Sequence, residues 1–414
     1  MRRLDTIALL RTTLTMILAG GQGERLYPLT RDRAKPAVPF GGIYRIIDFT
    51  LSNCVNANLR RVYVLTQYKS SSLDRHLRLG WNIFNPELGE FLYTIPPQQR
   101  ATETWYRGTA DAIYQNIYTL EQERPGRVLV LSGDHVYKMD YSRMLRFHEE
   151  RDADLTVACV EISRDRAGQL GVMEVDGEAR IVGFDEKPEH PKPTPDDPER
   201  SLVSMGVYVF RTETLVRAVA EDAKRNTAHD FGRNIIPEMV AGGRVFAYRF
   251  QDENRKEEQY WRDIGAIDTY YEANMDLVAV VPLFNLYDSA WPIRTYQEQY
   301  PPAKTVFDEA GEGGRRGMLL NTLVAGGCIV SGGRVERSVL SYGVRVHSHA
   351  VVEDAILMEG VDVGRGAHVR RAIIDKDVIV PPGCRIGLDP VEDRRRFTVT
   401  EGGVVVVPKG LPVD

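Results

Sequence analysis

Leu14-Thr-Met-Ile-Leu-Ala-Gly-Gly-Gln-Gly-Glu-Arg-Leu26 is an apolar run that leads directly into a glycine-rich turn. Such a run is typical of a parallel strand that is buried on both faces. Similar runs follow at Val62–Leu65, Val128–Leu131 and Leu155–Val160. Helical periodicity separates them at Ala110–Glu121 and Tyr141–Arg151. The alternation predicts an α/β domain with a mostly parallel sheet, whose ligands bind at the carboxyl ends of the strands.

The chain of 414 residues is longer than a single hydrophobic core usually supports, so we expect more than one domain. A proline-rich acidic loop at Glu189–Pro198 precedes another strand, at Val203–Phe210. A second irregular stretch contains several prolines and the run Gly311-Glu-Gly-Gly314, after which the composition changes. We therefore predict a first domain at residues 12–290, a linker at 291–317 and a second domain at 318–414.

Aliphatic residues recur at every fifth or sixth position in the second domain, with small or polar residues between them. They are Ile329, Val335, Leu340, Val346, Val352, Leu357, Val363, Val369, Ile374, Val380 and Ile386. This near-hexapeptide period predicts a β-helix whose coils bury one aliphatic side chain per face. A β-sandwich is the alternative, but its strands have a period of two.

Composition excludes several classes of protein. The formal net charge is −5, from 53 Lys and Arg against 58 Asp and Glu, so no general basic field attracts nucleic acid or a membrane surface. The four cysteines are far apart, which argues against a disulfide framework and a zinc knuckle. The apolar stretch Ile7–Leu10 is too short for an export signal. A cytoplasmic location is the expectation.

The glycine-rich turn is the first candidate site. Gly20, Gly21 and Gly23 allow backbone N–H groups to approach an anion closely, although a plain tight turn is the alternative. The turn is neither a P-loop nor a complete dinucleotide fingerprint, because no Gly-Lys-Ser/Thr follows and Leu26 stands where a third glycine is needed. Arg25 and Lys35 follow closely and could hold the same phosphates.

Carboxylates supply a candidate metal site. Asp134 follows the strand Val128–Leu131, and Asp263 lies in Trp261-Arg-Asp-Ile-Gly265. Two such oxygens can hold Mg²⁺ while phosphates and water complete its octahedron, although either aspartate alone could be a turn residue. We assign neither His135 nor His229 as a general base, because a phosphate dianion is already a competent nucleophile.

Several motifs occur together in one order, and the order is more specific than any single motif. They are Gly20-Gly-Gln-Gly-Glu-Arg-Leu26, Arg33-Ala-Lys-Pro-Ala37, Gly133-Asp134, Glu186-Lys-Pro188 and Trp261-Arg-Asp-Ile-Gly265. Through them the chain resembles the sugar-1-phosphate nucleotidyltransferases over nearly its whole length. Further motifs are most similar to the bacterial members that make ADP-glucose: Phe40–Phe49, Leu51–Cys54, Trp105–Ala112, Ser204–Gly206 and Trp291–Tyr296.

The resemblance implies a Rossmann-like nucleotidyltransferase domain followed by a left-handed parallel β-helix of hexapeptide-like repeats. It implies the reaction of ATP with α-D-glucose 1-phosphate to give ADP-glucose and pyrophosphate, for glycogen synthesis, with Mg²⁺ bound by Asp134 and Asp263. Arg25, Lys35 and Asp134 would be catalytic, and Gly20, Gly21, Gly23, Gln67, Gly108 and Thr109 would bind the nucleotide. The sugar phosphate would meet Tyr106, Gly171, Glu186, Lys187, Ser204, Asp230 and Trp261.

The resemblance also implies a homotetramer and allosteric control, but the regulatory positions depart from the family pattern. Asp32 stands where members activated by fructose 1,6-bisphosphate often have lysine, and Pro39 stands where the best-known enteric type has histidine. A basic effector pocket between the domains remains expected at Arg33, Arg45, Arg370 and Arg371.

Three other functions remain open. The chain could use UTP or dTTP in place of ATP, or it could be a non-catalytic regulatory subunit. The β-helix could also carry an acyltransferase with His347 or His349 as base, although a structural or oligomer-forming role suits so short a solenoid better.

Overall fold

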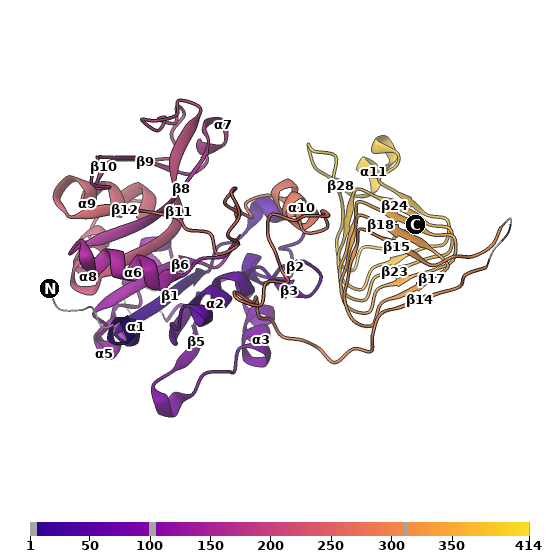
Figure 1. The fold of residues 1–414 in the computed structure, drawn as a ribbon, viewed down its shortest axis with the longest axis horizontal. Helices are drawn as coiled ribbons and strands as arrows, with labels where there is room; N and C mark the ends of the chain where they lie inside the picture. The colour runs from indigo at the N-terminus through magenta and orange to yellow at the C-terminus, as the bar shows by residue number, and fades with distance from the viewer. Residues whose placement is uncertain (1–5, 99–104, 310, 312, 414) are drawn as a thin grey trace.

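A computed structural model describes residues 6–98, 105–309, 311 and 313–413 of the chain. Figure 1 shows an α/β unit and a solenoid side by side, with helix α10 (Ile267–Asp276) and the short strands β2 (Pro39–Phe40) and β3 (Tyr44–Arg45) where the two meet. Both predicted fold classes are confirmed. Among the described residues, no helix has the length and apolar character needed to cross a membrane.

A nine-stranded sheet forms the centre of the α/β unit, in the order β10-β9-β11-β6-β1-β4-β5, with β8 and β12 joined through β11. Its strands are β1 (Thr13–Ala19), β4 (Arg61–Thr66), β5 (Phe91–Ile95), β6 (Arg127–Ser132), β8 (Leu155–Ser163), β9 (Gly171–Val175), β10 (Ile181–Glu186), β11 (Arg200–Arg211) and β12 (Val245–Arg249). Parallel pairing joins β5, β4, β1 and β6, whereas β11 is antiparallel to both β6 and β8. The carboxyl ends of β1, β4 and β6 therefore lie at one edge.

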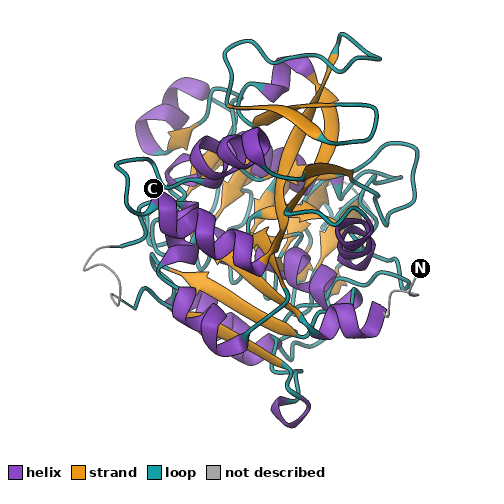
Figure 2. Cartoon of the chain, turned by 90° about the vertical axis from the view of Figure 1, so that its left-hand side faces the viewer, coloured by secondary structure: helices purple, strands orange, loops and turns teal. Residues whose placement is uncertain are grey.

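Helices lie against the sheet, as Figure 2 shows. They are α1 (Thr6–Arg11), α2 (Ile47–Asn56), α3 (Ser71–Gly80), α4 (Thr109–Tyr114), α5 (Ile117–Glu123), α6 (Tyr141–Glu150), α7 (Arg164–Ala167), α8 (Thr212–Asp222) and α9 (Ile236–Gly242). Short helical turns occur at Glu24–Leu26, Lys35–Ala37, Pro86–Leu88 and Phe231–Ile235. Two buried apolar clusters result, which contain alternate residues of β1 such as Ile17 and Met16.

The helix predicted at Ala110–Glu121 is two helices, α4 and α5. The break falls at Asn116, whose backbone (φ −110°, ψ 15°) is not helical. Its side-chain amide donates to the carbonyl oxygen of Ala112 at 2.8 Å and to the hydroxyl of Tyr106 at 3.1 Å. These local bonds compete with the continued helical pattern, which explains why apolar periodicity alone did not reveal the break.

Three parallel sheets form the β-helix. The first contains β14 (Lys304–Val306), β17 (Ile329–Ser331), β20 (Arg345–Val346), β23 (Asp362–Val363) and β26 (Ile379–Val380). The second contains β15 (Met318–Leu320), β18 (Arg334–Glu336), β21 (Val351–Glu353), β24 (His368–Arg370) and β27 (Arg385–Ile386). The third contains β16 (Leu323–Val324), β19 (Val339–Leu340), β22 (Ile356–Leu357), β25 (Ala372–Ile374), β29 (Val405–Val407) and, antiparallel at its edge, β28 (Thr398–Val399). Helix α11 (Pro390–Arg396) precedes β28.

The aliphatic repeat fills the solenoid interior. Val335 pairs with Val352 and Val352 with Val369, so three hexapeptide-like steps make one coil of 17 residues. All three side chains are fully buried. One repeat position is shifted: Val330 fills the interior, whereas its neighbour Ile329 is only half-buried. Strand β14 belongs to the first solenoid sheet although its residues fall within the stretch predicted as linker.

The third solenoid sheet is apolar on both faces. Its outward row, Val339, Ile356, Ile373 and Val406, is as deeply buried as its inward row. This outward row joins a cluster with Phe40, Phe49 and residues of α10, including Tyr270. Burial of such a surface is the main favourable term in association, so this face holds the solenoid against the α/β unit.

A buried ion pair crosses the same interface. The guanidinium of Arg33 donates to both carboxylate oxygens of Asp375, at 2.9 and 3.0 Å, and the two side chains are only 6% and 3% exposed. Arg33 was expected in an effector pocket, but its guanidinium is occupied by this pair. Nearby, Arg31 donates to the backbone oxygen of Lys409. The loop before Lys35 is therefore bound to the solenoid.

Replacing Asp375 by alanine leaves Arg33 as a buried, unpaired charge, so we expect a loss of about 3–5 kcal/mol in the free energy of unfolding. The matched control is Asp377→Asn, which removes the charge of an exposed pair with Lys409, suits the left-handed backbone at that position (φ +58°) and should cost about 0–1 kcal/mol. Urea denaturation followed by circular dichroism measures both. Equal losses in the two variants would contradict a stabilising role for the buried pair.

Candidate active site

The glycine-rich turn follows β1 at the carboxyl edge of the sheet, as expected. Gly23 has a φ of +66°, and a Cβ there would lie 3.1 Å from the Cβ of Lys35, so only glycine fits easily. A Cβ on Gly20 would lie 3.0 Å from Gln67, whereas one on Gly21 would meet open space. The turn therefore packs against Lys35 on one side and opens to a cavity on the other.

That cavity, of about 280 Å³, brings together most of the residues expected to bind a nucleotide. It is lined by Gly20, Gly21, Gln67, Gly108 and Thr109, together with Tyr106 and Asp230, which were expected at the sugar phosphate. Gly23 is not among the lining residues. The backbone N–H groups of Gly108 and Thr109 have no acceptor among the described residues and are free to bind a ligand.

Asp134 and Asp263 meet beside Lys35. Asp134 follows β6, and Asp263 ends β13 (Trp261–Asp263), which pairs with β7 (His135–Tyr137) so that Asp263 lies opposite His135. The Lys35 ammonium donates to Asp134 at 2.6 Å and lies 3.6 Å from Asp263. One ligand atom each from Asp134, His135 and Asp263 fall within 4.8 Å of one another. Two carboxylates so placed fit a divalent cation.

Electrostatics keep this group charged. Burial disfavours an ionised Asp134, but the Lys35 ammonium, followed by His135, lowers the pKa of that carboxyl to about 2. Burial likewise opposes the charge on Lys35, yet Asp134 and Asp263 raise its pKa above the ordinary value. A cation and an ionised carboxylate are therefore both present at neutral pH.

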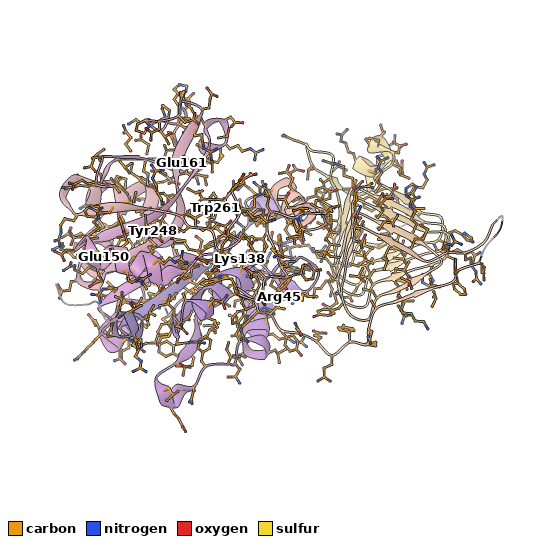
Figure 3. All side chains as sticks on the ribbon, in the orientation of Figure 1. Arg45, Lys138, Glu150, Glu161, Tyr248 and Trp261 are labelled. Carbon is orange, nitrogen blue, oxygen red and sulfur yellow. The ribbon has the colours of Figure 1, made fainter. Side chains whose placement is uncertain are left out.

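Arg25 and Trp261 lie near Asp263. With Asp263 and Gly265 they line a larger cavity of about 1170 Å³. A Cβ on Gly265 would lie 3.4 Å from an Arg25 guanidinium nitrogen. The Trp261 ring packs edge-on against His135, with the ring centres 5.3 Å apart, and Figure 3 labels Trp261 between Glu161 and Lys138. Trp261 thus belongs with the paired carboxylates.

The remaining sugar-phosphate candidates gather around Glu186. Gly171 pairs with Glu186 across β9 and β10, and a Cβ on Gly171 would lie 2.9 Å from a Glu186 carboxylate oxygen. Burial, and then the charge of Asp230, raise the pKa of Glu186 above its usual value. Lys187 is about half exposed and lies 3.8 Å from Glu186. Ser204 accepts a hydrogen bond from the N–H of Gly206 and contacts the hydroxyl of Tyr208 at 3.3 Å.

The four arginines expected to form one effector pocket do not all line one cavity. Arg45 lines a small interdomain cavity of about 40 Å³ with Lys376 and Glu359, and Figure 3 shows it on the side that faces the solenoid. Arg371 donates to the backbone oxygen of Gly402 and lies over the Tyr271 ring, while Arg370 is exposed. Only Arg45 of the four lines that cavity.

Comparison with known proteins identifies the family of the chain. The nucleotidyl transferase family model matches residues 14–279. The chain belongs to the nucleotidyl transferase family. A second model, for the GlmU-like C-terminal hexapeptide, matches residues 301–407 of this nucleotidyl transferase.

Several curated relatives are similar over nearly their full length. A glucose-1-phosphate adenylyltransferase of Rhodopirellula baltica is 55% identical, over 97% of this chain and 91% of the relative. One of Koribacter versatilis is 54% identical, over 96% of this chain and 95% of the relative. Glucose-1-phosphate adenylyltransferase 2 of Vibrio cholerae is 51% identical, over 97% of this chain and 98% of the relative. These identities support the resemblance to the bacterial members that make ADP-glucose as well as membership of the family.

Proposed function

We propose that this nucleotidyl transferase is a glucose-1-phosphate adenylyltransferase, which converts ATP and α-D-glucose 1-phosphate into ADP-glucose and pyrophosphate. The observation that carries the proposal is identity of 51–55% over nearly the whole chain to proteins of that name. The lining of the nucleotide cavity, with the paired carboxylates and the cations Lys35 and Arg25, is consistent with it.

The reaction joins two polyanions, so its main requirement is to hold like charges together. An oxygen of the sugar phosphate attacks the α-phosphorus of ATP, and the bond from that phosphorus to the departing pyrophosphate breaks. Lys35 and Arg25 would bind the triphosphate and stabilise charge on the pyrophosphate, while the N–H groups of Gly108 and Thr109 would face the adenine. Positioning and charge stabilisation supply most of the catalysis in such transfers.

Asp134 and Asp263 would hold Mg²⁺, because this ion takes oxygen ligands and completes its shell with phosphate oxygens and water. The ion, when bound, neutralises charge on the phosphates. Lys35 now contacts Asp134 and would exchange that contact for the triphosphate. On the sugar side, Glu186 and Asp230 would accept hydrogen bonds from glucose hydroxyls, and Lys187 would pair with the sugar phosphate.

We further propose that the product feeds glycogen synthesis in the cytoplasm and that the enzyme is an allosterically controlled homotetramer. Strands β5, β14 and β26 lie at the edges of their sheets, and each has one side without a partner strand among the described residues, which suits pairing with a second chain. Arg45 and Lys376, at the interdomain cavity, are the remaining cationic candidates for an effector site.

Purified protein incubated with Mg²⁺ and glucose 1-phosphate should release pyrophosphate with ATP and much less with UTP or dTTP. Reactions with and without sugar-phosphate activators identify the effector. Preference for UTP or dTTP would keep the chemistry and overturn the adenylyl assignment. No release with any nucleotide would favour a regulatory subunit.

Asp134→Asn should lower turnover roughly 10²- to 10⁴-fold, because it removes a metal ligand and a charge that orients Lys35. Asp176→Asn, in an exposed turn between β9 and β10, is the matched control and should keep normal turnover. Steady-state rates with saturating ATP measure the effect. Near-normal turnover of folded Asp134→Asn would remove Asp134 from the catalytic group.

Lys187→Ala should mainly raise the KM for glucose 1-phosphate, by roughly tenfold or more, because one hydrogen bond to a charged group is lost. Lys192→Ala is the control: its ammonium is similarly exposed but pairs with Glu174 and Asp185. The two KM values are compared at saturating ATP. An unchanged KM in Lys187→Ala would place the sugar phosphate elsewhere.

A further inference from the structure

His229 and Asp222 form a buried pair behind the nucleotide cavity. Nδ1 of His229 lies 2.7 Å from a carboxylate oxygen of Asp222, and each residue is only 2% exposed. The other carboxylate oxygen of Asp222 accepts a hydrogen bond from the hydroxyl of Thr227 at 2.7 Å, and the backbone N–H of His229 donates to that hydroxyl at 3.1 Å. These bonds fix the loop that connects α8 to the turn at Phe231–Ile235.

The pair holds the His229 backbone in an unfavourable conformation. Its φ is +51°, a left-handed value that is uncommon for residues other than glycine, although Asn, Asp and His adopt it more often than alanine does. In this conformation the His229 carbonyl oxygen accepts the N–H groups of Ala110 (2.8 Å) and Asp111 (3.3 Å), the first turn of α4. Helix α4 has no side-chain cap, so this carbonyl satisfies N–H groups that would otherwise lack a partner.

The same loop determines where the Gly108 backbone can lie. A Cβ on Gly108 would lie only 2.3 Å from the carbonyl oxygens of Ala228 and His229, so residue 108 packs directly on the loop. One residue further, Asp230 accepts a hydrogen bond from the Thr109 hydroxyl at 2.9 Å, and the N–H of Phe231 donates to that hydroxyl at 2.9 Å. The loop and the start of α4 are therefore held together by direct contacts.

His229 itself does not line the cavity. The cavity is lined by Gly108, Thr109 and Asp230, whereas His229 is not among its lining residues. Acid-base catalysis by His229 is therefore excluded by position. Its carbonyl and the residue that follows it instead contact residues that do line the cavity: Gly108, Thr109 and Asp230.

We infer that Asp222 and His229, with Thr227, are positioning residues that set the Gly108–Thr109 backbone and Asp230 for ligand binding. Breaking the pair removes the restraint that keeps His229 left-handed, so its carbonyl and Asp230 both shift. The inference rests on the proposed function for the identity of the ligands. It predicts that the protein loses affinity for both ATP and glucose 1-phosphate. In the proposed function, the Gly108–Thr109 backbone contacts the nucleotide and Asp230 contacts the sugar phosphate.

The test compares His229→Asn with His229→Ala. Asparagine tolerates a left-handed backbone, and its side-chain amide can donate to Asp222 from about the position of Nδ1. Alanine offers neither property, although both substitutions leave a cavity where the ring was. We expect His229→Ala to raise the Kd for ATP, measured by calorimetry without sugar phosphate, and the KM for glucose 1-phosphate by about tenfold or more. His229→Asn should stay within about threefold of the original chain for both.

Thermal unfolding of both variants separates positioning from packing. If the ring of His229 acts only by packing, both substitutions lower stability and change the Kd for ATP equally. Equal Kd values in His229→Asn and His229→Ala would therefore overturn the inference. An unchanged Kd in folded His229→Ala would overturn it as well. If His229→Ala does not fold, Asp222→Asn replaces it in the test, because it keeps the side-chain volume. Asp222→Asn should raise the Kd for ATP several-fold. An unchanged Kd in Asp222→Asn would also overturn the inference. If the unsubstituted chain binds UTP instead, the adenylyl proposal fails, while the Asn-to-Ala ratio measured with UTP still tests the positioning pair.

Discussion

The rest of the site depends on one constraint: three charged side chains, Lys35, Asp134 and Asp263, share one small volume. Two carboxylates repel each other unless a cation lies between them, and here the ammonium is 2.6 Å from one and 3.6 Å from the other. Each charge comes from a different part of the chain: a loop after β1, the end of β6 and the distant strand β13. The fold must hold these three segments together before any substrate arrives.

Much of this arrangement follows from local sequence. The four apolar runs became β1, β4, β6 and β8, and the rule that parallel strands end at one edge brought the glycine turn and Asp134 together. The hexapeptide period likewise revealed the solenoid interior. In both cases the signal is a short period in one stretch of chain, so no knowledge of distant contacts is needed.

Other features could not be predicted in this way, because they depend on pairs far apart in sequence. Arg33 resembled an effector ligand, and only the contact with Asp375 reveals its structural use. His229 was considered only as a base, and the packing of Gly108 on its carbonyl has no local sequence signal. One missed signal was present: the doublets Val339-Leu340, Ile356-Leu357, Ile373-Ile374 and Val406-Val407 indicate a sheet that is apolar on both faces.

Coil-by-coil pairing in the solenoid has a consequence for synthesis on the ribosome. Each coil needs only a neighbour 17 residues away, so it can form soon after it emerges, whereas β8 waits for β12, some ninety residues later. The exception is β29, which joins β25 only after α11 and β28 have been made. Until β29 emerges, β25 presents an open apolar edge to the surroundings of the nascent chain, which exposes the protein to aggregation at that stage.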